Sequence, residues 1–179
     1  HLELNNGKGS LSTADNFTTG SQAAVAKGTT TVIDMATPNK GGSLKDCLAT
    51  WNQLAEGKSS CDYTYHMSMI EWKPTIAAEI QEMIAAGITS FKMYMAYDNL
   101  WTTDAEIFEA MKEIKKVNGM LGVHCENGDL VDELIQSYVS QGKLTPHYHP
   151  LSRPAAVEAE AVARYLMIAE MADLSVNIV

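Results

Sequence analysis

The chain has 179 residues, 46% of them hydrophobic and 20% charged, which is typical of globular proteins and unlike disordered ones. Its formal net charge is −9 and no stripe of basic residues is present, so we expect no nucleic-acid partner, because phosphate binding needs clustered Lys and Arg. No apolar stretch approaches the roughly 20 residues that span a bilayer, so we expect no membrane partner either.

Strand and helix patterns alternate from the start of the chain. In order, we expect a helix over 15–27 ended by Gly28, a strand over 29–35, a helix over 43–55, a strand over 63–70, a helix from Pro74 to Gly87, and a strand over 89–96. The helices carry apolar residues at helical spacing and end at glycines. The strands are β-branched, aromatic or apolar.

The same alternation continues to the end of the chain. We expect a helix begun by the capping box Thr103-x-x-Glu106 and closed by Gly119, a strand over 120–125, a helix capped by Asp129, a polar loop over 143–153, a long alanine-rich helix opened by Pro154, and a strand over 175–179. Alternating strands and helices predict a parallel sheet with helical crossovers. An open doubly wound sheet and a (β/α)₈ barrel both satisfy this order, and periodicity does not choose between them.

The terminal residues indicate whether the protein is longer than this sequence, and the cysteines indicate its redox compartment. It begins with His1 rather than methionine and ends at Val179 inside an apolar run. A barrel needs roughly 250 residues, so we expect residues 1–179 to be part of a longer protein. Cys47, Cys61 and Cys125 form neither a CxxC pair nor a disulfide framework, which favours a reducing cytoplasm.

Lys92 is the first candidate site residue, because it lies inside the apolar strand SFKMYMAY. An ammonium there is costly to bury unless it is paired or neutralised. One interpretation is a lysine whose head reaches a carboxylate. The other is a neutral, nucleophilic lysine with a lowered pKa, which can take up carbon dioxide and become a carbamate that bridges two metal ions.

His124 and Tyr97 end two of the predicted strands, where function collects in parallel α/β folds. His124 could be a metal ligand or a core histidine. Glu126, Asn127 and Asp129 are candidates to hold its second ring nitrogen. Tyr97 could pack at the rim or donate a hydrogen bond to an oxyanion. We expect His66, His147 and His149 not to be ligands.

Several segments together resemble one family, in order and through nearly the whole chain. They are HLEL, TADNFTTGSQAAVAKGTTTVIDM, CDYTYHMSMIEW, SFKMYMAY, VHCENGD and LSRPAAVEAEAVARY. They look like successive blocks of the dihydropyrimidinase and hydantoinase family of the amidohydrolase superfamily. SFKMYMAY together with VHCENGD is the most specific part of the match.

The resemblance implies a (β/α)₈ metal-dependent hydrolase barrel, of which residues 1–179 would supply about strands 2 to 6. It implies a binuclear centre, usually zinc, held by His1, carbamylated Lys92 and His124, with Tyr97 contacting the substrate carbonyl. A further histidine ligand and an aspartate general base would lie after Val179. The fragment alone would be inactive, and family members are often tetramers.

The implied reaction is the hydrolytic opening of dihydropyrimidines or 5-substituted hydantoins to N-carbamoyl amino acids by a metal-bridged hydroxide. Two alternatives stay open. Allantoinases and dihydroorotases share the lysine and histidine ligands but typically lack YMAY after the lysine. Non-catalytic relatives that act through protein interactions have lost ligand positions, whereas His1, Lys92 and His124 are all present here.

Overall fold

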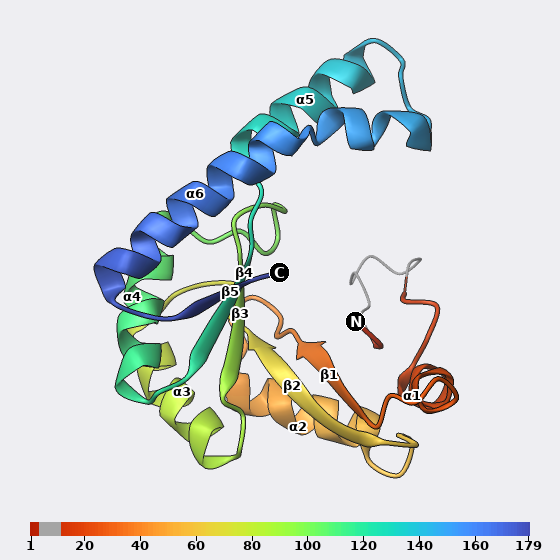
Figure 1. The fold of residues 1–179 in the computed structure, drawn as a ribbon, viewed down its shortest axis with the longest axis vertical. Coiled ribbons are helices and arrows are strands. Elements are labelled where there is room, and N and C mark those ends of the chain that lie inside the picture. The colour runs from red at the N-terminus through yellow and green to blue at the C-terminus, as the bar shows by residue number, and fades with distance from the viewer. Residues whose placement is uncertain (4–11) are drawn as a thin grey trace. The chain divides into compact units, whose positions relative to one another are not determined.

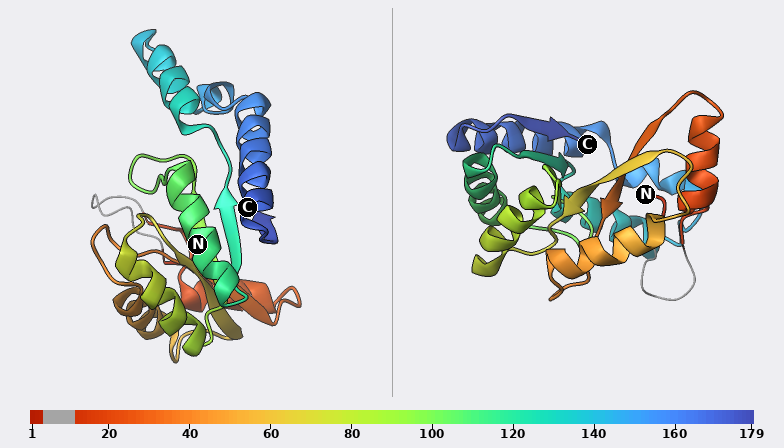
Figure 2. Two further views of the ribbon diagram at one scale, coloured as in Figure 1. Left: turned by 90° about the vertical axis from the view of Figure 1, so that its left-hand side faces the viewer. Right: turned by 90° about the horizontal axis from the view of Figure 1, so that it is seen from below.

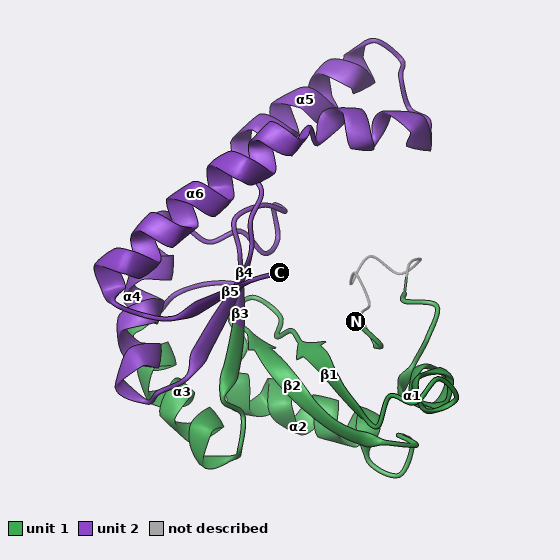
Figure 3. Cartoon of the chain, in the orientation of Figure 1, with its two compact units in different colours: residues 1–69, 74–91 green, residues 70–73, 92–179 purple. Residues whose placement is uncertain are grey.

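A computed structural model describes residues 1–3 and 12–179 of the chain. The five strands belong to one sheet in the order β1-β2-β3-β4-β5, and every helix after the first strand lies in a connection between successive strands (Figure 1). The predicted α/β alternation is therefore confirmed. The chain divides into two compact units, and the boundary falls within β3 between Phe91 and Lys92 (Figure 3).

Unit 1 contains residues 1–69 and 74–91. Its elements are α1 (Phe17–Val25), β1 (Thr31–Ala36), α2 (Leu44–Ala55), β2 (Asp62–Ser68) and α3 (Pro74–Ala85). β1 and β2 are parallel, with Asp34 beside Tyr65. α2 begins at the predicted position because the Ser43 side chain accepts the Asp46 N–H, and α2 packs on both strands and on α3.

Unit 2 contains residues 70–73 and 92–179. Its elements are the end of β3 (Ser90–Tyr94), α4 (Asp104–Lys116), β4 (Met120–His124), α5 (Gly128–Ser140), two short 3₁₀ turns (Pro146–Tyr148 and Pro150–Ser152), α6 (Ala155–Ala172) and β5 (Val176–Ile178). β4 and β5 are parallel, with Val123 beside Ile178. α6 packs against α4 (Figure 2).

The capping box predicted at Thr103 is present in full. The Thr103 hydroxyl accepts the Glu106 N–H at 3.3 Å, and the Glu106 carboxylate accepts the Thr103 N–H at 2.7 Å. The predicted cap of α5 was wrong. The Asn127 side chain, not that of Asp129, accepts the Leu130 N–H at 3.2 Å, and Asp129 lies in the first turn, where its carboxylate faces the positive end of the helix dipole.

Apolar side chains of both units are buried around the strands. Phe91, Met93 and Met95 are at most 1% exposed, and so are Leu121 and Val123 on β4. A polar side chain that is buried among these apolar ones is unusual and therefore needs a physical explanation. Among residues 1–3 and 12–179, no helix is long and apolar enough to cross a membrane.

Candidate active site

Lys92 is the buried cation of β3. The residue is 3% exposed, and its Nζ lies 5.1 Å from the centre of the Tyr94 ring. No carboxylate in the described part of unit 2 forms an ion pair with it. Burial lowers the pKa of the ammonium from 10.5 to about 8, and the nearby Cys125 thiol acts in the opposite direction. These features favour a partly neutral amine over a lysine paired to a carboxylate.

His124 ends β4 on the same face of the sheet as Lys92. The Met95 N–H donates to the His124 carbonyl at 3.0 Å. In a parallel pair such a bond aligns Met95 with Cys125, and hence Tyr94 with His124. Side chains alternate between faces along a strand, so Lys92 and Tyr94 both point to the face that carries His124. Two of the predicted site residues therefore share one face, with His124 further toward the carboxyl ends.

Tyr97 lies directly over His124. Their ring centres are 5.0 Å apart and the ring planes are inclined by 35°, while the Tyr94 ring packs edge-on against Tyr97 at 6.5 Å. The four side chains thus form a continuous cluster, which we name the Lys92–His124 cluster: Lys92, Tyr94, Tyr97 and His124. Tyr97 is 42% exposed, so its ring joins the cluster at the solvent side rather than in the core.

The backbone at Tyr97 is strained, with φ at +75°, a left-handed conformation that residues other than glycine seldom adopt. The Tyr97 carbonyl accepts the N–H groups of Leu100 and Trp101 at 2.8 and 2.9 Å, which holds the turn in place. Burial and the Glu126 carboxylate raise the pKa of the Tyr97 phenol, and Arg153 partly opposes them. The phenol is therefore protonated near neutral pH and can donate a hydrogen bond.

The start of α5 lies against the turn that carries Tyr97. The Gly128 N–H donates to the Met95 carbonyl at 3.3 Å. A Cβ at Gly128 would be 2.9 Å from that carbonyl oxygen and 3.2 Å from Ala96 Cα, and neither backbone atom can move aside easily. Glycine is needed here for close approach of two backbone segments.

Glu126 is the residue that holds the ring of His124. Its Oε2 lies 2.8 Å from His124 Nε2, and its Oε1 lies 3.7 Å from Arg153 Nε. Of the three candidates named from sequence for this role, only Glu126 fills it. Asn127 instead caps α5 and donates to Glu160 at 2.7 Å, and Asp129 lies in the first turn.

His1 belongs to unit 1. The neighbouring Leu2 N–H donates to Asp34 Oδ1 at 2.9 Å, and Trp51 Nε1 donates to Asp34 Oδ2 at 3.0 Å. Asp34 is 3% exposed, so this buried carboxylate fixes the backbone next to His1. The sequence did contain a signal for it, namely an aspartate inside the apolar strand TTTVIDM.

The remaining histidines have structural partners or lie on the surface. His66 Nδ1 lies 2.5 Å from the Ser90 hydroxyl, while His147 and His149 are exposed. Within residues 1–3 and 12–179, no group of three or more His, Cys, Asp or Glu side chains is arranged to hold a metal ion. The binuclear centre implied by the resemblance relies on a modified lysine and on ligands outside residues 1–179, so its ligand set stays a prediction.

The residues present do fit part of such a centre. Carbamate formation needs a neutral amine, and burial favours the neutral form of Lys92. Metal ligation by His124 needs a ring nitrogen with a free lone pair. The Glu126 carboxylate occupies Nε2 and leaves Nδ1 for this purpose.

The sequence is similar to curated hydrolases over nearly its whole length. It is 40% identical over 167 residues to a D-hydantoinase of Rhizobium radiobacter, covering 93% of this chain and 36% of that protein. It is 38% identical over 167 residues to a dihydropyrimidinase of Rattus norvegicus, covering 92% and 32%. The chain therefore spans about a third of the length of these two relatives. No family model matches the chain.

The fold agrees with solved structures of the same enzymes. The dihydropyrimidinase of Brevibacillus agri NCHU1002 matches with a TM-score of 0.95 and 34% identity over 99% of this chain and 39% of its own. A D-hydantoinase structure matches with a TM-score of 0.95 and 37% identity over the same shares. By sequence and by fold, the chain is similar over nearly its whole length to proteins of the dihydropyrimidinase and D-hydantoinase family.

Proposed function

We propose that residues 1–179 form the central part of a longer hydrolase, which opens cyclic amide rings of dihydropyrimidines or 5-substituted hydantoins to N-carbamoyl amino acids. The relatives named D-hydantoinase and dihydropyrimidinase support the substrate class. The observation that carries the proposal is Lys92, a buried lysine whose pKa is lowered to about 8 and which shares one face of the sheet with His124.

The proposed metal centre would be held by His124 Nδ1, by Lys92 as its carbamate, and by His1, the last on the family resemblance alone. When bound, two divalent metal ions would supply Lewis-acid polarisation of the ring carbonyl and activate a water for attack. Uptake of carbon dioxide would form a bond between Lys92 Nζ and the carbon of carbon dioxide and release one proton, which turns the neutral amine into an anion with two oxygen atoms. Bound metal cations would match the charge of that anion in the buried strand.

Tyr97 would orient the substrate in this mechanism. Its protonated hydroxyl can donate a hydrogen bond to the carbonyl oxygen as that oxygen gains negative charge during attack. Hydrolysis adds water across the ring C–N bond, which leaves a carboxylate on carbon and an N–H on the departing nitrogen. The proton shuttle for this step is assigned to the aspartate that the resemblance implies outside residues 1–179.

We also propose zinc as the metal, a cytoplasmic location and a homo-oligomer, a tetramer by resemblance. Imidazole ligands suit zinc. Cys47, Cys61 and Cys125 are unpaired, as expected of a reducing compartment. Metal analysis of the purified protein tests the first point, and light scattering during size-exclusion chromatography tests the last.

The direct test of function is an assay of the full-length protein, loaded with zinc, on dihydrouracil and on a 5-substituted hydantoin. The expected result is ring opening of at least one of them, seen as loss of ring absorbance and formation of the N-carbamoyl amino acid. No turnover of either by protein that holds about two zinc ions per subunit would contradict the proposal. No turnover together with no bound zinc would instead favour a non-catalytic scaffold.

A further inference from the structure

The contact between His124 and Glu126 has a direct consequence for the tautomer of the histidine. A neutral imidazole carries one N–H and one lone pair, and a carboxylate can only accept a hydrogen bond. With Glu126 Oε2 2.8 Å from Nε2, the proton belongs on Nε2 and the lone pair on Nδ1. Nδ1 is therefore the nitrogen prepared to bind a metal ion.

Glu126 is itself held from a distant part of the chain. Its other oxygen faces Arg153 Nε at 3.7 Å, and the two side chains are only 13% and 18% exposed. Arg153 lies between the second 3₁₀ turn and α6, and its backbone N–H donates to the Pro150 carbonyl at 3.3 Å. The carboxylate thus lies between an imidazole and a guanidinium, with one oxygen toward each.

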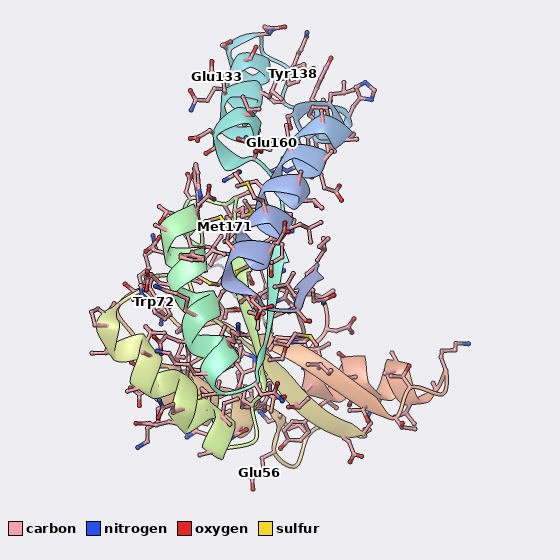
Figure 4. The ribbon with its side chains drawn as sticks, turned by 60° about the vertical axis from the view of Figure 1, so that its left-hand side comes forward. Glu56, Trp72, Glu133, Tyr138, Glu160 and Met171 are labelled. Atoms are coloured by element: carbon pink, nitrogen blue, oxygen red, sulfur yellow. The ribbon has the colours of Figure 1, made fainter. Side chains whose placement is uncertain are left out.

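The backbone next to Glu126 is fixed to α6 as well. The Asn127 N–H donates to the Val157 carbonyl at 3.0 Å, and Asn127 Nδ2 donates to Glu160 Oε2 at 2.7 Å. Glu160 lies on α6, and Figure 4 shows it on the ribbon together with Glu133 of α5. Since these bonds do not involve the Glu126 side chain, loss of that side chain should leave the path of the backbone unchanged.

We propose that Glu126 and Arg153 are positioning residues for metal binding by His124. Glu126 fixes the tautomer and the ring orientation that present Nδ1, and Arg153 fixes the rotamer of Glu126. Through Arg153, the segment that begins α6 takes part in building the site. This inference rests on the proposed function, because it assigns His124 as a ligand.

Substitutions at Glu126 and at Arg153 should weaken zinc binding to different degrees. Glu126→Ala removes the acceptor, so the ring can rotate and either nitrogen can carry the proton. Glu126→Gln keeps an acceptor oxygen of the same reach but loses the negative charge. Arg153→Ala leaves the hydrogen bond to His124 possible but frees the carboxylate to move. Loss of such supporting contacts typically weakens metal binding by about 10- to 100-fold.

The experiment measures zinc affinity of the full-length protein by competition with a chromophoric chelator, without using activity as the readout. We expect about 10- to 100-fold weaker binding for Glu126→Ala, a smaller loss for Glu126→Gln, and a loss between wild type and Glu126→Ala for Arg153→Ala. Glu133→Ala is the matched control, since Glu133 is an exposed glutamate on α5, and it should bind zinc as the wild type does. Circular dichroism checks that each variant is folded.

Unchanged zinc affinity in folded Glu126→Ala, with normal zinc content in the wild type, would overturn this inference alone. Wild-type zinc affinity in folded Arg153→Ala would overturn the role given to Arg153, because the Glu126 carboxylate would then keep its place without the guanidinium. A wild-type protein that binds no zinc would overturn the proposed function together with this inference, so the two failures are distinguishable.

Discussion

The Tyr97 ring lies over the His124 imidazole, with ring centres 5.0 Å apart, although 27 positions separate the two residues in sequence. Tyr97 reaches this place through a left-handed backbone turn that follows β3, and His124 through the end of β4. The pair joins a hydrogen-bond donor to a candidate metal ligand.

Tyr97→Phe should lower kcat of the full-length enzyme by about 10²- to 10³-fold, as removal of one oxyanion donor does elsewhere. The ring and its packing on His124 remain, so zinc content and thermal stability should not change. Steady-state kinetics with dihydrouracil, alongside metal analysis, provide the measurement. A rise in KM at unchanged kcat would contradict the oxyanion role, because it would show that the hydroxyl binds the ground state and the transition state equally.

Lys92→Ala should abolish the bridging ligand. We expect loss of bound zinc and a fall in activity on the order of 10³-fold or more, because the water-activating site is no longer assembled. Metal analysis and an activity assay measure both effects. Lys116→Ala serves as control, since Lys116 is a surface lysine paired with Glu113. Zinc content and rate equal to the wild type in Lys92→Ala would refute the role given to this residue.

The lowered pKa of Lys92 predicts how stability depends on pH in the protein freed of metal and carbon dioxide. The pKa is about 8 in the folded state, against 10.5 for an ordinary lysine. Between these values the unfolded chain binds more protons than the folded one, so the free energy of unfolding should rise with pH from about 8 to about 10.5. Below about pH 8 the buried charge destabilises the fold fully.

Chemical denaturation of wild type and Lys92→Met across this pH range isolates the effect, because other titrating groups cancel in the difference. The wild type should gain stability relative to Lys92→Met as pH rises. A difference that stays flat over the range would mean that the amine is charged and solvated in the folded protein.

Gly128→Ala tests the close approach between α5 and the turn that carries Tyr97. The added methyl group would meet the Met95 carbonyl oxygen at 2.9 Å, so we expect destabilisation of about 1–3 kcal/mol, the usual cost of overpacking. Thermal unfolding measures it. Gln136→Ala, at an exposed position of the same helix, should leave the melting temperature nearly unchanged. Equal melting temperatures for wild type and Gly128→Ala would contradict the predicted clash.

The sequence was sufficient to predict the order of the elements, because each carries a local signal. The apolar strand around Lys92 and the Thr103 capping box are examples, and both are confirmed. The Asp129 cap was predicted wrongly since Asn127, two residues earlier, has an equally suitable side chain, and only the backbone path decides between them. The polar loop over 143–153 contains two 3₁₀ turns, each begun by a proline.

The residues that hold His124 and the backbone next to His1 in place are harder to predict from sequence than the elements are. Glu126 was a candidate because it stands two positions after His124. Arg153 lies 27 positions beyond Glu126, and nothing in a periodic pattern reports a contact at that separation. Asp34 likewise reaches the backbone of Leu2 across 32 positions. Such contacts depend on how the elements pack, which local patterns do not encode.

The chemical state of Lys92 can be seen by anomalous X-ray diffraction at the zinc edge from crystals of the full-length protein. We expect two zinc peaks, continuous density for a carbamate on Lys92 Nζ between them, and His124 Nδ1 as a ligand to one. An unmodified Lys92 amine with no zinc peak at His124 would contradict it.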